Sequence, residues 1–286
     1  MEELSISEQL LYTTIRIECT LKDGGQCTGT GFFFEVEDQK GIIPTLITNK
    51  HVVKDASKVC LIFCIRNEND NPDDQKHFSV TIDEFEKSWV LHPDPKVDLC
   101  IMPIGPILNQ VNKDYGINLY YRTFCEKNLP NAALFDEITA LEDIVMIGYP
   151  NGIWDKKNNK PVFRKGITAT DIKFDYNGEK EFLIDAACFP GSSGSPVVLL
   201  NKGMYMDRKG NVHTGCIRMA LLGVLYAGPQ YRATGDIRTI DIPTAEKNIV
   251  VSSIPNNLGY VIKSERIQEL EEELEKRIKM QRLNQQ

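Results

Sequence analysis

The sequence has none of the features that mark a membrane-inserted or nucleic-acid-binding chain. It contains no uninterrupted apolar run of about 18 residues, the length that a membrane-spanning helix needs. Lys and Arg number 33 against 40 Asp and Glu, so the formal net charge is −7 and no basic block is available for a phosphate backbone. We therefore expect neither a membrane nor a nucleic acid as a partner.

The signals of a secreted or zinc-stabilised protein are also missing. Residues 1–19 carry acidic side chains where a secretion signal needs basic ones, and no apolar segment with a small-residue cleavage site follows. The cysteines include no Cys-x-x-Cys pair, so we expect no structural metal site, and nothing indicates a cofactor. We expect a cytoplasmic protein with free thiols. The eight cysteines are Cys19, Cys27, Cys60, Cys64, Cys100, Cys125, Cys188 and Cys216.

Short β-branched and aromatic runs separated by turn residues dominate what the sequence does contain. The runs TTIRIEC, TGTGFFFEV and KVCLIFCI are typical of the first half, and DIVMIGYP, EFLIDAAC and SPVVLL of the second. Such runs at regular spacing predict an all-β fold. Because the strands fall into two sets of about six, we expect two six-stranded antiparallel β-barrels packed side by side with a cleft between them.

The strand pattern weakens once along the chain and ends before the C-terminus, which suggests four segments. We expect an N-terminal barrel over residues 1–118 and a connection over 119–136. A C-terminal barrel is expected over residues 137–261 and an α-helix over 262–286.

The expected helix is amphipathic. In SERIQELEEELEKRIKMQRL, residues 264–283, apolar side chains recur at spacings of three and four. Docking of this face onto the second barrel is the favoured interpretation, because only about two to three heptads are present for a coiled coil. A coiled coil that joins copies of the chain stays open, and the helix is also a candidate surface for a regulatory protein partner. The apolar residues are Ile267, Leu270, Leu274 and Ile278.

The stretch CFPGSSGSPVV, residues 188–198, places three serines within four residues between glycines and prolines. A serine hydroxyl is a poor nucleophile at neutral pH unless an imidazole takes its proton and a third group orients that imidazole. PGSSG can also aim the N–H groups of Gly191 and Ser193 at one point, as an oxyanion hole requires. Only four histidines can serve this stretch: His51, His77, His92 and His213.

One histidine and one carboxylate stand at strand ends. His51 comes after the apolar run LIT and a two-residue polar link. The end of a strand at this point would place it at the rim of a barrel. Asp98 begins the apolar run DLCIMPI, where a carboxylate is costly to bury unless a group such as a histidine Nδ1 pairs with it. Asp94, between two prolines, stays open as a rival, and His51 itself stays open as a packed strand-end residue.

The order TNKHVV, DLCIM and DAACFPGSSGSPV resembles the chymotrypsin-fold serine peptidases, including trypsin-like and HtrA/Deg-like enzymes. EDIVMIGYPNG and GVLYAG are similar to that family's strands that open the second barrel and carry the substrate. The resemblance covers about residues 10–260 and points to a bacterial cytoplasmic type without a PDZ domain. It implies a serine endopeptidase that forms an acyl-enzyme, with Ser193 as nucleophile, His51 as general base and Asp98 as its orienting group.

Two positions depart from the family pattern. Ser192 stands where the family usually has Asp or Asn, and Ser195 where it has Gly. Because Ser192 carries no charge, we do not expect activation through a freed N-terminal amine. The departures leave a second function open, a catalytically degenerate peptidase fold that acts as a binding or scaffold module. Cys188, five residues before Ser193, also stays open as a competing nucleophile.

The resemblance implies a specificity pocket as well. Its floor would be Ala187 with Cys188 beside it, and its other wall would be Tyr226, Ala227 and Gly228. An apolar floor offers no counter-charge for Lys or Arg, so we expect protein or peptide substrates with a small or medium apolar residue before the cut.

Overall fold

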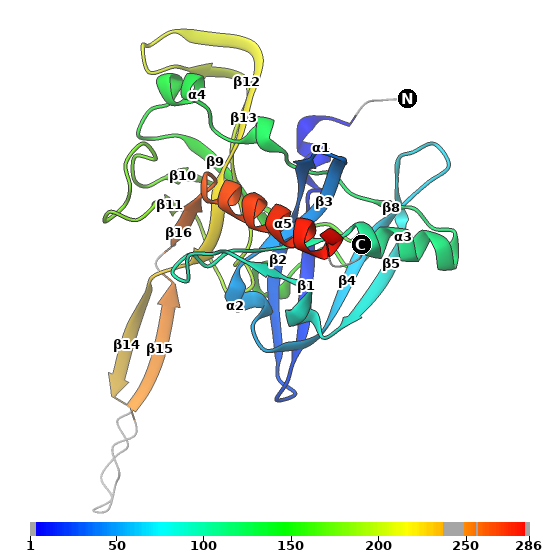
Figure 1. Cartoon of the computed structure of the whole chain (residues 1–286). Helices are drawn as coiled ribbons and strands as arrows, with labels where there is room; N and C mark the ends of the chain where they lie inside the picture. The colour runs from blue at the N-terminus through cyan, green and yellow to red at the C-terminus, as the bar shows by residue number, and fades with distance from the viewer. Residues whose placement is uncertain (1–3, 237–248, 256, 284–286) are drawn as a thin grey trace, which may run out of the picture.

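The computed structural model describes residues 4–236, 249–255 and 257–283. Two antiparallel β units lie side by side and a helix follows them (Figure 1). Residues 1–3 of the segment predicted over 1–118 and residues 284–286 of the segment predicted over 262–286 lie outside the described residues. The same is true of residues 237–248 and 256 in the segment predicted over 137–261.

The first β unit is an eight-stranded sheet that curls around its own core. Its hydrogen-bonded order is β5-β4-β1-β2-β3-β7-β6, and β8 pairs with β4. The described path does not close, which differs in detail from the expected six-stranded barrel. The strands are β1 (Thr14–Leu21), β2 (Gln26–Asp38), β3 (Gly41–Thr48), β4 (Ala56–Arg66), β5 (Pro72–Asp83), β6 (Val90–Leu91), β7 (Cys100–Pro103) and β8 (Leu119–Tyr120).

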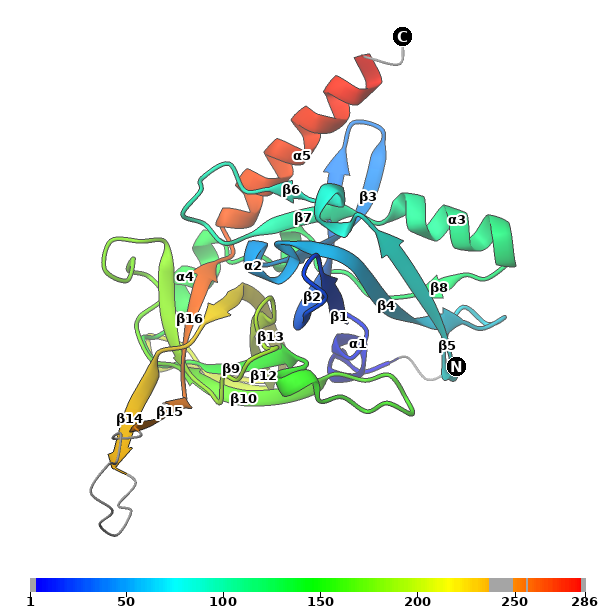
Figure 2. The same ribbon diagram turned by 90° about the horizontal axis from the view of Figure 1, so that it is seen from below.

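The second β unit is a closed barrel with the strand order β10-β11-β16-β13-β12-β9. A further hairpin of β14 (Gln230–Asp236) and β15 (Ile249–Pro255) projects from it, away from the rest of the molecule (Figures 1 and 2). The predicted all-β class with two antiparallel units and a C-terminal helix is confirmed. The barrel strands are β9 (Asp143–Gly148), β10 (Val162–Thr168), β11 (Glu181–Asp185), β12 (Pro196–Met206), β13 (Val212–Ala227) and β16 (Leu258–Lys263).

Short helices lie before and between these strands. The predicted connection over residues 119–136 contains β8, which joins the first sheet through β4, so the link between the units is partly built into the first unit. The division into segments otherwise stays a prediction. The helices are α1 (Ile6–Leu10), α2 (Lys50–Val53), η1 (Phe85–Ser88), α3 (Gly105–Tyr115), η2 (Glu126–Asn128), α4 (Ala132–Glu137) and η3 (Pro150–Gly152).

The three consecutive phenylalanines of β2 show how the two units share their core. Successive side chains of a strand point to opposite faces. Phe33 therefore packs inside the first unit, whereas Phe32 and Phe34 enter a cluster shared with the second unit and the C-terminal helix. All three are buried, so neither face of this part of β2 is left to solvent.

The C-terminal helix α5 (Arg266–Leu283) packs beside β6 and β7 of the first unit (Figure 2). Ile267, Leu270 and Leu274 are buried in the shared core cluster. The expected docking onto the second barrel is correct only in part, because the helix shares a core cluster with side chains of that barrel and also packs on β6 and β7 of the first unit. Its apolar face is covered within the chain. No helix among the described residues is long and apolar enough to cross a membrane.

One acidic residue of α5 makes its packing sensitive to pH. Burial raises the pKa of Glu271 from its ordinary value of 4.5 to about 7, and nearby Glu126 and Glu275 add to the rise. Its buried Oε1 has no hydrogen-bond partner among the described residues. The folded state therefore holds a proton that the unfolded state releases between these two pH values, and ionisation at higher pH opposes folding.

We expect the free energy of unfolding to fall as pH rises from about 5 to about 8, and Glu271→Gln to reduce this fall because glutamine stays neutral. Denaturant unfolding at both pH values measures it. Glu272→Gln, at an exposed neighbouring position, is the matched control. An unchanged pH dependence in Glu271→Gln would contradict the assignment.

Candidate active site

His51 and Asp98 lie in direct contact. The Nδ1 atom of His51 is 2.5 Å from Oδ2 of Asp98, and the His51 backbone N–H donates to Oδ1 at 3.0 Å. Asn49, which precedes α2, donates from Nδ2 to the backbone carbonyl of Asp98 at 2.8 Å. The carboxylate holds Nδ1 of a half-exposed imidazole, so a base at this position would act through Nε2.

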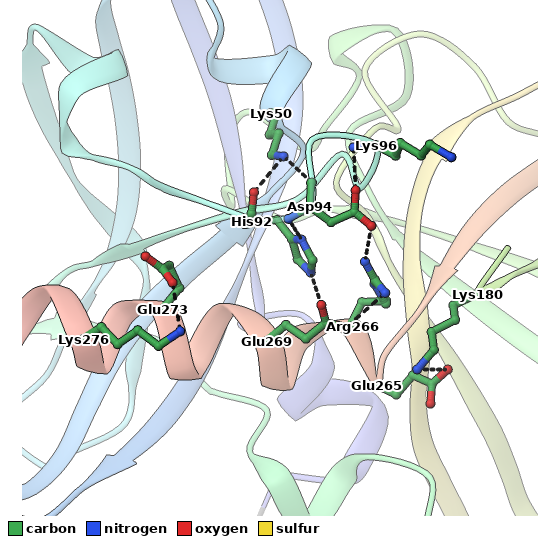
Figure 3. Close-up of polar contacts among 10 residues, drawn as sticks. All are labelled: Lys50, His92, Asp94, Lys96, Lys180, Glu265, Arg266, Glu269, Glu273 and Lys276. Atoms are coloured by element: carbon green, nitrogen blue, oxygen red, sulfur yellow. Dashed lines mark hydrogen bonds and ion pairs between the residues drawn. The ribbon is translucent and has the colours of Figure 1, made fainter.

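The rival carboxylate and two of the other histidines have partners elsewhere, and the third, His77, lies in β5 opposite Cys64. Asp94 accepts from Arg266 Nη2 at 2.9 Å and from the Lys96 backbone N–H at 2.9 Å (Figure 3). His92 is buried beneath the same loop, and His213 pairs with Asp207 at 3.1 Å. His51 is thus the histidine that the fold pairs with Asp98.

The turn between β11 and β12 carries the serines. Gly191 and Gly194 both adopt positive φ angles, +87° and +85°. A Cβ at Gly194 would lie 1.9 Å from the carbonyl oxygen of Thr30, and one at Gly191 would lie 2.7 Å from that of Tyr149. Glycine is required at both positions, because any side chain would be strained and would clash with backbone.

Within residues 191–195 of this turn, two backbone N–H groups have no acceptor among the described residues. They belong to Gly191 and Ser193, whereas the neighbouring N–H groups of Ser192, Gly194 and Ser195 all donate to carbonyls. Two free donors on one turn match what an oxyanion hole needs. These are the two N–H groups that the sequence analysis assigned to an oxyanion hole, and that role stays a prediction.

The Ser193 hydroxyl donates to the backbone carbonyl of Tyr226 at 3.3 Å. In the part of the chain that the structure describes, it makes no hydrogen bond to His51. Tyr226 falls in the irregularity where β13 changes register against β16, so it has no partner residue in the ladder with β16. The turn is held from the same strand, because Leu225 bonds to both Gly194 and Ser195.

A fully buried threonine of the first unit holds the serine turn from the other side. The backbone N–H of Thr30 donates to the Ser193 carbonyl at 2.8 Å, and its Oγ1 donates to the Gly191 carbonyl at 3.0 Å. The same Oγ1 accepts from the Tyr149 N–H at 3.1 Å, and Thr48 donates to the Thr30 carbonyl at 2.7 Å. Sequence reasoning missed Thr30, although a threonine between two glycines in the run TGTGFFFEV was a usable signal.

A cavity of about 280 Å³ lies beside Ser193. Three of the residues expected at the specificity pocket line it, namely Cys188, Ala227 and Gly228. Ala187 and Tyr226, also expected there, are not among its lining residues, and the Tyr226 hydroxyl donates to Glu181 at 3.0 Å. The sequence did not identify four further lining residues, which are Phe189, Pro190, Leu225 and Pro229.

Two charged residues near this cavity, Arg164 and Asp185, are not among its lining residues. The guanidinium of Arg164 lies 5.0 Å over the ring of Phe189, which lines the cavity. Burial raises the pKa of the Cys188 thiol to about 11, so this sulfur is a neutral wall of the cavity at pH 7. Cys188 is therefore a poor competitor of Ser193 as nucleophile.

Comparison with known proteins gives one family match and several similar folds. Residues 29–204, more than half of the chain, match the model of the trypsin-like peptidase domain. No curated protein sequence is significantly similar. A crystal structure of the inactive form of a serine-to-alanine mutant of Rv3671c from M. tuberculosis H37Rv is 15% identical, with a TM-score of 0.40 over 90% of this chain and 83% of that one.

Two other solved structures are similar to a comparable extent. The HtrA-type protease AlgW with tripeptide is 15% identical, with a TM-score of 0.43 over 89% of this chain, which spans 57% of that protein. The Rv3671c protease in its inactive form is 16% identical, with a TM-score of 0.39 over 92% of this chain and 88% of that one.

Thr30→Val is expected to lower peptide hydrolysis by about 10- to 100-fold, because it leaves the Gly191 carbonyl and the Tyr149 N–H unpaired and loosens the serine turn. Thr30→Ser keeps the hydroxyl and should retain most activity. Thr45→Val is the matched control, since the buried Thr45 hydroxyl bonds Phe34 at 2.7 Å, away from the turn. Steady-state kinetics of the three variants measure the effect, and equal losses in both valine variants would contradict this role.

Proposed function

This chain belongs to the trypsin-like peptidase domain family, and we propose that it is an active serine endopeptidase with the triad Ser193, His51 and Asp98. The contact between His51 Nδ1 and Asp98 Oδ2 carries the proposal, because it fixes the tautomer that a general base needs. The free N–H groups of Gly191 and Ser193, on the same turn as the hydroxyl, support it.

Substrate binding would bring the hydroxyl to its base. A peptide lying along β13 can donate a backbone N–H to the Tyr226 carbonyl, which is the group that the Ser193 hydroxyl occupies. Displaced from this acceptor, the hydroxyl is free to donate to Nε2 of His51. Hydrogen bonds of this kind are often not formed in free enzymes and tighten only with substrate.

The chemistry then follows in two steps. Ser193 Oγ attacks the scissile carbonyl carbon while His51 Nε2 takes its proton, and the two free N–H groups stabilise the negative oxygen. His51 returns the proton to the leaving amine, and an acyl-enzyme remains on Ser193. A water molecule, deprotonated by the same imidazole, hydrolyses this ester and restores the hydroxyl.

A small or medium apolar residue before the cut fits the cavity best. Its walls are apolar or neutral. Arg164 would repel a lysine or arginine side chain, and Asp185, whose charge acts on the Cys188 thiol, is not among the lining residues. A cation placed there would lose its hydration without gaining a partner.

A degenerate peptidase fold that acts as a binding module is the second candidate. The observation that favours it is the hydrogen bond from Ser193 to Tyr226 in place of one to His51. In this function the turn would bind a peptide without cleaving it.

Reaction with a fluorophosphonate probe separates the two candidates. We expect the wild-type chain to be labelled at Ser193, and Ser193→Ala and His51→Ala each to lose on the order of 10⁶ in hydrolysis rate. Because the two groups act as a unit, the double variant should lose no more than either single one. Absence of labelling in correctly folded wild-type protein would favour the binding module.

Specificity can be measured with a peptide series that differs only at the residue before the cut. We expect valine, alanine or leucine to exceed lysine and arginine by about 100-fold or more in kcat/KM, because of the unpaired buried cation. Arg164→Gln should narrow this gap by removing the repulsion. A preference of wild-type protein for lysine or arginine would contradict the assignment of the cavity.

A further inference from the structure

We propose that Arg266, the first residue of α5, is a positioning residue for the triad. It holds the loop of residues 92–98 against the body of the protein and thereby keeps Asp98 in place beside His51. The proposal rests on the function proposed above, and it gives the C-terminal helix a part in catalysis.

The loop joins β6 to β7 and has Asp98 at its end. It is closed at its base by a hydrogen bond from the His92 N–H to the Leu99 carbonyl at 3.0 Å, and within it the Val97 N–H donates to the Asp94 carbonyl at 3.2 Å. Both the backbone and the side chain of Asp98 are bonded to the start of α2. A displacement of this loop therefore moves the carboxylate relative to the imidazole.

The inner side of the loop is held by the residue next to the proposed base. Lys50 Nζ donates to the carbonyls of His92 and Asp94, each at 3.0 Å (Figure 3). Lys50 and His51 are consecutive in α2. The loop that carries the orienting carboxylate is thus tied directly to the helical turn that carries the base.

The outer side of the loop is held by α5. Arg266 Nη2 lies 2.9 Å from Asp94 Oδ2, and Nη1 of the same guanidinium lies 3.0 Å from Glu269 Oε1. The Arg266 side chain is only 13% exposed, so this pair is better shielded from water than an ordinary surface ion pair. Figure 3 shows Arg266 reaching from the helix to the loop, opposite Lys50.

A buried histidine fills the space between the loop and the helix. His92 accepts the Asp94 N–H at Nδ1, at 3.1 Å, so its proton sits on Nε2, which faces Glu269 Oε2 at 3.5 Å. Burial lowers the pKa of His92 and keeps it neutral. This packing makes the loop and the first turn of α5 one unit.

The start of α5 cannot shift to compensate for a change at Arg266. Ile267 and Leu270 are fully buried in the core cluster shared by both β units. The helix is a fixed support, and the contact between Arg266 and Asp94 transmits its position to the loop.

The test compares three variants of α5 in the full chain. Arg266→Ala removes the support, and Arg266→Lys keeps a positive charge for Asp94. Arg282→Ala removes another α5 ion pair, at 2.8 Å to Asp38, which ends β2 and is not part of the loop. Two measurements are made on each: kcat and KM on a peptide substrate, and the downfield proton NMR signal of the His51 Nδ1–H bonded to Asp98, identified by its loss in His51→Ala.

We expect Arg266→Ala to lower kcat by about 10- to 100-fold with KM nearly unchanged, since a small misplacement of a catalytic group costs about this much. Its Nδ1–H signal should shift or broaden, and Arg266→Lys should restore both properties in part. For comparison, Asp98→Asn, which replaces the orienting carboxylate itself, should lower kcat by about 10⁴. If Arg266→Ala lowers kcat no more than Arg282→Ala, or leaves the NMR signal unchanged, the proposal is wrong.

The NMR measurement separates this proposal from the proposed function. If wild-type protein hydrolyses no peptide, the endopeptidase assignment fails, while the signal still reports whether Arg266 holds Asp98 against His51. If hydrolysis is normal and the signal does not respond to Arg266→Ala, only the positioning role fails.

Discussion

The hydrogen bonds of Thr30 are the contact on which the candidate site depends. This side chain belongs to the first β unit, yet it bonds the serine turn of the second unit at Gly191 and at Ser193. His51 and Asp98 lie on the first unit and Ser193 on the second. Their relative placement therefore requires that the two units be joined firmly close to the turn. The fully buried Thr30 joins them through neutral hydrogen bonds, which salt does not screen.

The hydrogen bonds of Thr30 are neutral, and Ser192 adds no charge to the turn. That residue is buried, and its hydroxyl has no partner among the described residues, so the turn has no charged anchor of its own at this position. Each neutral hydrogen bond contributes about 1 kcal/mol net, and several of them converge on one turn. Glycine at positions 191 and 194 lets the backbone approach Thr30 and Tyr149 closely enough to form them. The arrangement is compact because only backbone and short side chains take part.

The second support of the site comes from the end of the chain. α5 fills the seam beside β6 and β7 with apolar side chains and presents Arg266 to the loop that ends in Asp98. Lys50 donates hydrogen bonds to two backbone carbonyls on the inner side of the same loop. The loop that ends in Asp98 is therefore held between two cations, Lys50 and Arg266. Both carboxylate oxygens of Asp98 are bonded to His51.

The sequence by itself determined the all-β class, the two sets of strands and the terminal helix, because alternation at period two and apolar spacing at three and four are local properties. It also pointed to His51, Asp98 and the turn at Ser193, which short motifs carry. Only the tertiary structure decided that the first sheet stays open, that α5 packs on β6 and β7, and that Thr30 and Arg266 support the site. An amphipathic stripe requires burial but does not say against which surface, and a single buried threonine or arginine acquires a role only when the fold brings its partner, distant in sequence, within hydrogen-bonding distance.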